Sequence, residues 1–237
     1  MRVLSIFLVL VFAFLSISAS AKVVGKDVDY KQGDTTLKGY LAYDDSVEGK
    51  RPGVLVVHEW WGHNEYARAR ADKLAELGYT ALAVDMYGDA QNADHPEKAG
   101  ELATAVLSNM DVAEARFQAA IDYLKAQPTV NPEYIAAIGY CFGGAVVLNM
   151  ALRGVDVDGV ASFHGILPQE APENAKPTAD IIVFHGGDDP FVPKEQFDKF
   201  KNIMKDTGAN YELIVYPGVK HSFTNPAADE YGKKFDL

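Results

Sequence analysis

Short apolar runs alternate along this chain with longer segments in which apolar residues recur every three or four positions. The short runs, such as Gly53–Val57, fit strands that are covered on both faces. The longer segments predict amphipathic helices. Because strands that alternate with helices form a mostly parallel sheet with helices on both faces, the sequence predicts an α/β fold.

The expected elements can be placed by their boundaries. We expect strands at Thr36–Tyr43 (an edge strand), Gly53–Val57, Thr80–Val84, Tyr134–Gly139, Val157–Phe163, Asp180–Phe184 and Tyr211–Tyr216. We expect helices at Asn64–Leu77, Pro96–Ala126 (with room for an interruption near Ser108–Asp111), Gly143–Leu152, Pro193–Asp206 and briefly after Pro226. The connections are short and contain no linker, so residues 22–237 are expected to form one domain. Ligands of such sheets bind beyond the carboxyl ends of the strands.

Residues 1–21 differ in character from the rest of the chain. Arg2 precedes an almost wholly apolar stretch, Leu4–Leu15, and small residues follow at Ala19 and Ala21. This order is typical of a secretory signal peptide cleaved after Ala21, whereas the alternative, a retained membrane anchor, would need a longer apolar run. We therefore expect an exported protein, periplasmic or secreted, that has no stable membrane insertion after cleavage.

Composition narrows the class of partner. Of the 237 residues, 48% are hydrophobic and 23% are charged, which suits a globular domain. The net charge of −11 argues against nucleic acid or an anionic membrane as partner. A small-molecule substrate is the remaining expectation, for a monomer or a small homo-oligomer. The single cysteine, Cys141, excludes an intramolecular disulfide.

A pattern for a reactive cysteine follows the expected strand at 134–139. There the chain reads GYCFGG (139–144) and continues into a helix, which is the G-x-S-x-G turn with sulfur in place of oxygen. Such a turn strains Cys141 and needs glycine at 139 and 143, because side chains there would meet neighbouring backbone. A helix N-terminus favours a thiolate, and the N–H of Phe142 is expected in an oxyanion hole. A buried, inert cysteine is the alternative, which three glycines in register disfavour.

A base and an acid are expected further along the chain, because a cysteine nucleophile needs a histidine that an acid orients. Asp188 and Asp189 follow one expected strand, and His221 follows the next. The candidate triad is therefore Cys141, one of the two aspartates, and His221, in the chain order of this fold.

The other five histidines receive other expectations. His185 is expected to pack or hydrogen-bond within its turn, and His164 is a candidate for the pocket wall. His58 and His63 flank a tryptophan pair, and His95 begins a helix in an exposed position. No tight ligand spacing such as H-E-x-x-H or C-x-x-C occurs, so no metal is expected.

The segment VHEWWG (57–62) follows the first buried strand, where this fold supplies a second oxyanion N–H. Trp60 is the candidate donor. Glu59 is either a solvated loop residue or a carboxylate at the mouth of the active site, and the sequence leaves both open.

Together, four segments resemble the dienelactone hydrolase family: HEWWG (58–62), GYCFGG (139–144), GGDDPFVP (186–193) and KHSF (220–223). The resemblance extends from about Val54 to Phe223. It implies the α/β-hydrolase fold, a Cys–Asp–His triad and no metal or organic cofactor.

The resemblance also assigns roles to individual residues. It implies that Cys141 is the nucleophile, His221 the base and Asp189, rather than Asp188, the acid. It further implies that Glu59 contacts the thiol in the resting enzyme and moves when substrate activates it.

The sequence departs from the family at the two positions that bind the carboxylate of the substrate. Dienelactone-cleaving members hold that carboxylate with two arginines, but Asn225 matches one of them and no arginine occurs in Met86–His95, where the other is expected. Without these two cations, the site attracts an anionic lactone less strongly.

These observations predict acyl transfer from a small ester or lactone through an acyl-enzyme on Cys141. An aromatic pocket is expected from Trp60, Trp61, Tyr87, Phe142, His164 and Phe191, which suits an apolar or aromatic substrate. Two alternatives remain: a thiol-based redox or thiol-reactive protein without hydrolytic turnover, and an inactive binding protein on the same fold.

Overall fold

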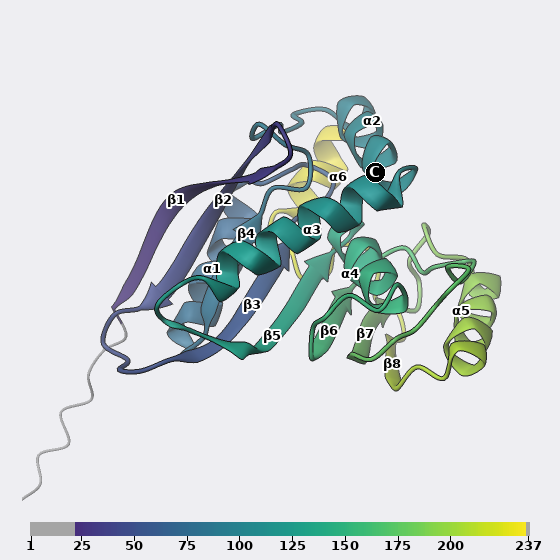
Figure 1. The fold of residues 1–237 in the computed structure, drawn as a ribbon. Coiled ribbons are helices and arrows are strands. Elements are labelled where there is room, and N and C mark those ends of the chain that lie inside the picture. Colours follow the sequence, from purple (N-terminus) through teal and green to yellow (C-terminus); the bar gives the residue numbers. More distant parts are fainter. Residues whose placement is uncertain (1–21, 236–237) are drawn as a thin grey trace, which may run out of the picture.

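The structure is a computed structural model that describes residues 22–235 (Figure 1). Its strands are β1 (Val23–Gln32), β2 (Thr35–Asp44), β3 (Arg51–Val57), β4 (Thr80–Val84), β5 (Val130–Tyr140), β6 (Gly159–Phe163), β7 (Asp180–Gly186) and β8 (Tyr211–Tyr216). Its helices are α1 (Glu65–Glu76), α2 (Pro96–Leu107), α3 (Met110–Lys125), α4 (Phe142–Leu152), α5 (Lys194–Thr207) and α6 (Ala228–Phe235). The signal peptide expected at 1–21 lies outside the described residues.

The strands form one eight-stranded sheet in the order β1-β2-β4-β3-β5-β6-β7-β8. β2 runs antiparallel to both β1 and β4, whereas β4, β3, β5, β6, β7 and β8 run parallel to one another. The carboxyl ends of six strands therefore meet at one edge of the sheet, and the loops after β3, β5, β7 and β8 gather there (Figure 1).

Apolar side chains alternate between the two faces of the sheet, and different helices cover each face. Leu55 of β3 belongs to the larger core, which α3 closes with residues such as Phe117. Val56, the next residue along, belongs to a smaller core that α1 closes with Ala67, Ala71 and Ala75. The prediction of a mostly parallel sheet with helices on both faces is confirmed.

β1 is the strand that the sequence did not predict. It pairs along its whole length with β2, so β2 is not the edge strand we expected. Most side chains of β1 are exposed or half-buried, and charged residues such as Lys26 and Asp27 interrupt its apolar pattern. An edge strand with little burial on either face leaves no clear alternation to detect.

The long helix expected at Pro96–Ala126 is two helices. α2 ends at Leu107, and the Asn109 side chain accepts a hydrogen bond from the backbone N–H of Val112 (3.3 Å), which caps the start of α3. The interruption that the sequence allowed near Ser108 is therefore real. Within residues 22–235, no helix has the length and apolar character needed to cross a membrane.

Candidate active site

Cys141 lies on a tight turn between β5 and α4. Its backbone has φ 54° and ψ −114°, in the region that L-residues rarely adopt. Glycine is required on both sides: a Cβ on Gly139 would lie 2.0 Å from the carbonyl oxygen of Gly143, and one on Gly143 would lie 2.3 Å from that of Val57. The turn places the half-buried sulfur at the N-terminus of α4 and at the carboxyl edge of the sheet.

An aspartate and a histidine follow two later strands at this edge. Asp189 comes after β7 and His221 after β8, and the His221 Nδ1 lies 2.8 Å from the Asp189 Oδ2. The other carboxylate oxygen accepts a hydrogen bond from the N–H of Phe191 (2.9 Å). Asp188 is exposed. The geometry thus pairs His221 with Asp189, which is the aspartate that the family resemblance favoured.

The local electrostatics favour a charged His221. Burial by itself would lower the pKa of the imidazole, but hydrogen bonding to Asp189 and to Cys141 raises it to about 10. Burial would likewise raise the pKa of Asp189, but the hydrogen bond and the positive charge of His221 lower it overall. The pair therefore favours an imidazolium beside a carboxylate at neutral pH.

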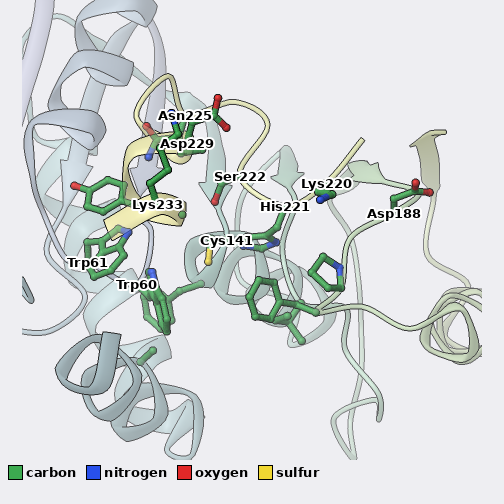
Figure 2. A pocket seen from close by; sticks show the side chains of 18 of the residues that line it. Trp60, Trp61, Cys141, Asp188, Lys220, His221, Ser222, Asn225, Asp229 and Lys233 are labelled. Atoms are coloured by element: carbon green, nitrogen blue, oxygen red, sulfur yellow. The ribbon is translucent and has the colours of Figure 1, made fainter. Parts of the chain in front are cut away.

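Cys141 and His221 open into a cavity of about 680 Å³. In Figure 2 the sulfur lies between Trp60 on one side and His221 on the other. The cavity is lined mainly by apolar and aromatic residues, with charges on two sides: Trp60, Trp61, Ala103, Leu107, Cys141, Phe142, Ile166, Asp188, Pro190, Phe191, Lys220, His221, Ser222, Asn225, Ala228, Asp229, Tyr231, Gly232 and Lys233.

The expected pocket wall is largely present. Trp60, Trp61, Phe142, Phe191 and Asn225 all line the cavity. Because Phe142 is the first residue of α4, its N–H has no partner within the helix, as an oxyanion donor requires.

Two residues expected in the pocket wall lie behind it, so that part of the prediction is wrong. Tyr87 is buried, and its hydroxyl donates to the carbonyl of Trp60 (2.9 Å). His164 is fully buried, and its Nδ1 accepts a hydrogen bond from the N–H of Cys141 (3.2 Å). Both side chains extend from strand ends beside the site, but each turns back to bind neighbouring backbone.

Glu59 is buried rather than solvated, with 3% of its surface exposed. Its carboxylate accepts a hydrogen bond from the Asn225 Nδ2 (2.6 Å) and a longer one from the Ser222 Oγ (3.5 Å). Burial raises the pKa of this carboxyl, which the hydrogen bond from Asn225 partly offsets. Glu59 therefore contacts the loop that carries His221, and its role toward the thiol stays a prediction.

Sequence reasoning missed two walls of the cavity. Ala103 and Leu107 come from α2, and Tyr231 and Lys233 come from α6. The apolar residues of α2 have the spacing of an ordinary core-facing helix, so nothing local distinguishes a pocket wall from core. α6 is held by Trp61, whose indole stacks on the Tyr231 ring at 4.7 Å.

Within residues 22–235, no group of three or more histidine, cysteine, aspartate or glutamate side chains is arranged to hold a metal ion.

Comparisons with known proteins agree with this geometry. A sequence profile of the dienelactone hydrolase family matches residues 37–236. Among solved structures, a dienelactone hydrolase-like promiscuous phosphotriesterase from metagenomic libraries shares 36% of its sequence with this chain. The two structures superpose with a TM-score of 0.84, and the match covers 89% of this chain and 88% of that one.

Sequence relatives agree as well. A protein of Aquifex aeolicus with the provisional name carboxymethylenebutenolidase is 31% identical over 214 residues, which cover 87% of this chain and 90% of the relative. A Bradyrhizobium protein with the provisional name 2-oxo-3-(5-oxofuran-2-ylidene)propanoate lactonase is 29% identical over 197 residues, 78% of each chain.

The mostly parallel sheet, the strained turn after β5, and the paired aspartate and histidine after later strands define an α/β-hydrolase. With the profile match and the relatives above, the chain belongs to the dienelactone hydrolase family and is a hydrolase.

Proposed function

We propose that this protein cleaves small esters or lactones with Cys141 as nucleophile, His221 as base and Asp189 as the acid that orients the base. One observation carries the proposal. The His221 imidazole is 2.8 Å from Asp189 and lines, together with the Cys141 thiol, a cavity with apolar walls. Nucleophile, base and orienting acid in this order are what acyl transfer requires.

The reaction proceeds in two halves. The Cys141 thiolate attacks the carbonyl carbon, and the N–H groups of Phe142 and Trp60 stabilise the oxyanion. The protonated His221 donates its proton to the leaving oxygen, the carbon–oxygen bond breaks, and a thioester forms on Cys141. Water then attacks the thioester while His221 takes up its proton, which releases the acid and regenerates the thiolate.

The cavity favours an uncharged substrate with an apolar or aromatic group. Where the family resemblance leads to an arginine there is Asn225, and its amide is already bound to Glu59. Lys220 and Lys233 line the cavity, but Asp188 and Asp229 line it too, so cations and carboxylates are equal in number there. With the cations offset in this way, the site offers a carboxylate substrate little net attraction.

Release of p-nitrophenol from p-nitrophenyl butyrate, in the presence of a reductant, tests the proposal. The mature protein should turn over, and Cys141→Ala should not. Ser108→Ala, which changes an exposed hydroxyl between α2 and α3, should match the wild type. A Cys141→Ala variant that keeps its activity would remove the cysteine from the mechanism. Stoichiometric alkylation of a wild type that shows no turnover would favour the thiol-reactive alternative.

A further inference from the structure

A chain of hydrogen bonds runs behind the cavity from α1 to Cys141. We call Arg70, Tyr66, Thr224 and His164 the rear network. The Tyr66 hydroxyl and the Thr224 Oγ1 are 2.8 Å apart, and the same Oγ1 is 2.7 Å from the His164 Nε2. The His164 Nδ1 then receives the N–H of Cys141 at 3.2 Å. Thr224 and His164 do not line the cavity, so the network is separate from the substrate surface.

The position of the proton on His164 follows from these partners. The N–H of Cys141, shared between the Phe163 carbonyl (3.0 Å) and the His164 Nδ1, can only donate. The Nδ1 must therefore be an acceptor, and in a neutral imidazole the Nε2 then carries the hydrogen. Thr224 is the acceptor of that hydrogen. Complete burial of His164 disfavours the charged form, so its pKa is lowered to about 3 and this tautomer persists at neutral pH.

Thr224 is also held from the side of α1. The Arg70 Nη2 donates to the Tyr66 hydroxyl (3.0 Å) and to the carbonyl oxygen of Thr224. The guanidinium lies over the rings of Tyr66 and Tyr140, at 4.9 and 5.1 Å from their centroids. A half-buried arginine between two aromatic rings has few other orientations, so it is a firm attachment for the loop.

Three non-glycine residues with positive φ lie within or beside the rear network: His164 (φ 42°) belongs to it, and Cys141 (φ 54°) and Ser222 (φ 56°) lie next to its members. Such conformations persist only where neighbouring contacts hold them. Thr224 is three residues after His221 and two after Ser222, and through His164 it reaches the backbone of Cys141. Its hydroxyl therefore joins the loop of the base to the turn of the nucleophile.

We propose that Thr224 is a positioning residue, whose hydroxyl, bound to His164, keeps the His221 loop in register with the Cys141 turn. The inference rests on the proposed function, because it concerns the same nucleophile and base. Without the hydroxyl, the His164 N–H is left without an acceptor in a buried place. The loop can then shift, and a displacement of about 1 Å at a reacting group is enough to slow catalysis by up to about a hundredfold.

The test compares Thr224→Val, which removes the hydroxyl, with Thr224→Ser, which keeps it. Thr207→Val is the matched control, because the Thr207 hydroxyl binds a carbonyl within α5 far from the site. For p-nitrophenyl butyrate, Thr224→Val should lower kcat about tenfold or more with KM within about twofold. Thr224→Ser should stay within about threefold of wild type, and Thr207→Val should equal it.

A second measurement does not depend on ester hydrolysis. The rate of Cys141 alkylation by iodoacetamide, followed against pH, reports how His221 and the thiol interact. Thr224→Val should change this pH profile, and Thr224→Ser should restore it. The positioning role is wrong if a folded Thr224→Val keeps the wild-type kcat and profile, if only its melting temperature falls, or if Thr224→Ser is as impaired as Thr224→Val. A wild type without turnover would contradict the proposed function, and the alkylation profiles would still decide the role of Thr224.

Discussion

At the scale of the residue, Cys141 is strained and its glycine neighbours make that strain possible. Gly139 and Gly143 are needed for space, since neither has a left-handed backbone and a Cβ on either would penetrate a neighbouring carbonyl. The backbone contact is rigid, so the turn cannot relax around a larger side chain as a surface loop could.

We expect Gly139→Ala to lower the free energy of unfolding by more than about 2 kcal/mol, because the new Cβ would meet the Gly143 carbonyl at 2.0 Å. Gly100→Ala is the matched control: this glycine is inside α2, and a Cβ there meets nothing within 4 Å. Gly100→Ala should instead raise the free energy of unfolding by about 0.5–1 kcal/mol. Urea unfolding of both variants tests this, and equal midpoints would contradict the expectation.

Asn225 is the residue at which the charge preference of the site can be tested. Asn225→Arg would place a cation next to Glu59 and at the cavity wall. We expect the ratio of kcat/KM for mono-p-nitrophenyl succinate over p-nitrophenyl butyrate to rise about tenfold, the effect of about 1.4 kcal/mol. Asn225→Gln, which adds length without charge, should leave the ratio unchanged. A rise with Gln would point to shape rather than charge.

At the scale of the element, α2 and α6 close the cavity although neither belongs to the sheet layers that form the site. α6 has no buried residue of its own and depends on stacking of Tyr231 on Trp61. α2 presents Ala103 to the cavity and packs with α3 on the other side. α2 therefore forms one wall of the cavity, and a larger side chain at Ala103 would narrow the space for substrate.

Ala103→Trp should narrow the cavity and separate substrates by length. We expect kcat/KM for p-nitrophenyl octanoate to fall at least tenfold more than that for p-nitrophenyl acetate, because the long chain loses apolar contact. Glu101→Trp, an exposed position of the same helix, controls for the added indole. Equal losses for both esters would show that α2 does not limit the substrate.

At the scale of the whole molecule, buried histidines link stability to pH. Burial lowers the pKa of His58 and of His63 to about 4, and that of His164 to about 3. In the unfolded chain these histidines titrate near 6.5. As pH falls through 6.5 the unfolded chain binds protons that the folded chain does not, so stability falls. His221 acts in the opposite direction: its stabilising contribution is complete below about 6.5 and is lost as pH rises through about 10.

We therefore expect the urea midpoint to be highest near neutral pH and lower at both pH 5 and pH 10. Each buried neutral histidine should lower the free energy of unfolding by about 2 kcal/mol between pH 7 and pH 5. His63→Phe should lose less stability than wild type over this interval, since the Nε2 of His63 has no partner among the described residues. A midpoint that does not change between pH 7 and pH 5 would contradict the neutral, buried state of these rings.

Export concerns the whole protein, but its prediction rests on residues 1–21 alone. We expect the protein to leave the cytosol with Lys22 as its new N-terminus. Mass spectrometry of the processed chain checks this, because a retained anchor would keep all 21 residues.

Much of the fold could be predicted because the patterns that define it are local. The buried strand β3 and the helix α1 show in the spacing of their apolar residues, and the turn at Cys141 shows in the glycines around it. β1 could not be predicted, because it gains its order from pairing with β2 and not from burial. The break before α3 depended on the cap that Asn109 supplies.

The candidate site, like the fold, could be predicted only where the sequence pattern is local. The sequence by itself determined which residue types follow which strands, and therefore Cys141, the aspartate pair and His221 as candidates. Only the tertiary structure decided that Asp189 is the aspartate beside His221, that His164 faces away from the cavity, and that α2 forms a wall. The physical reason is that residue patterns report contacts within a few positions. The direction of a side chain at a strand end depends on partners far along the chain: Asp189 and His221 are 32 residues apart, and Glu59 and Asn225 are 166 residues apart.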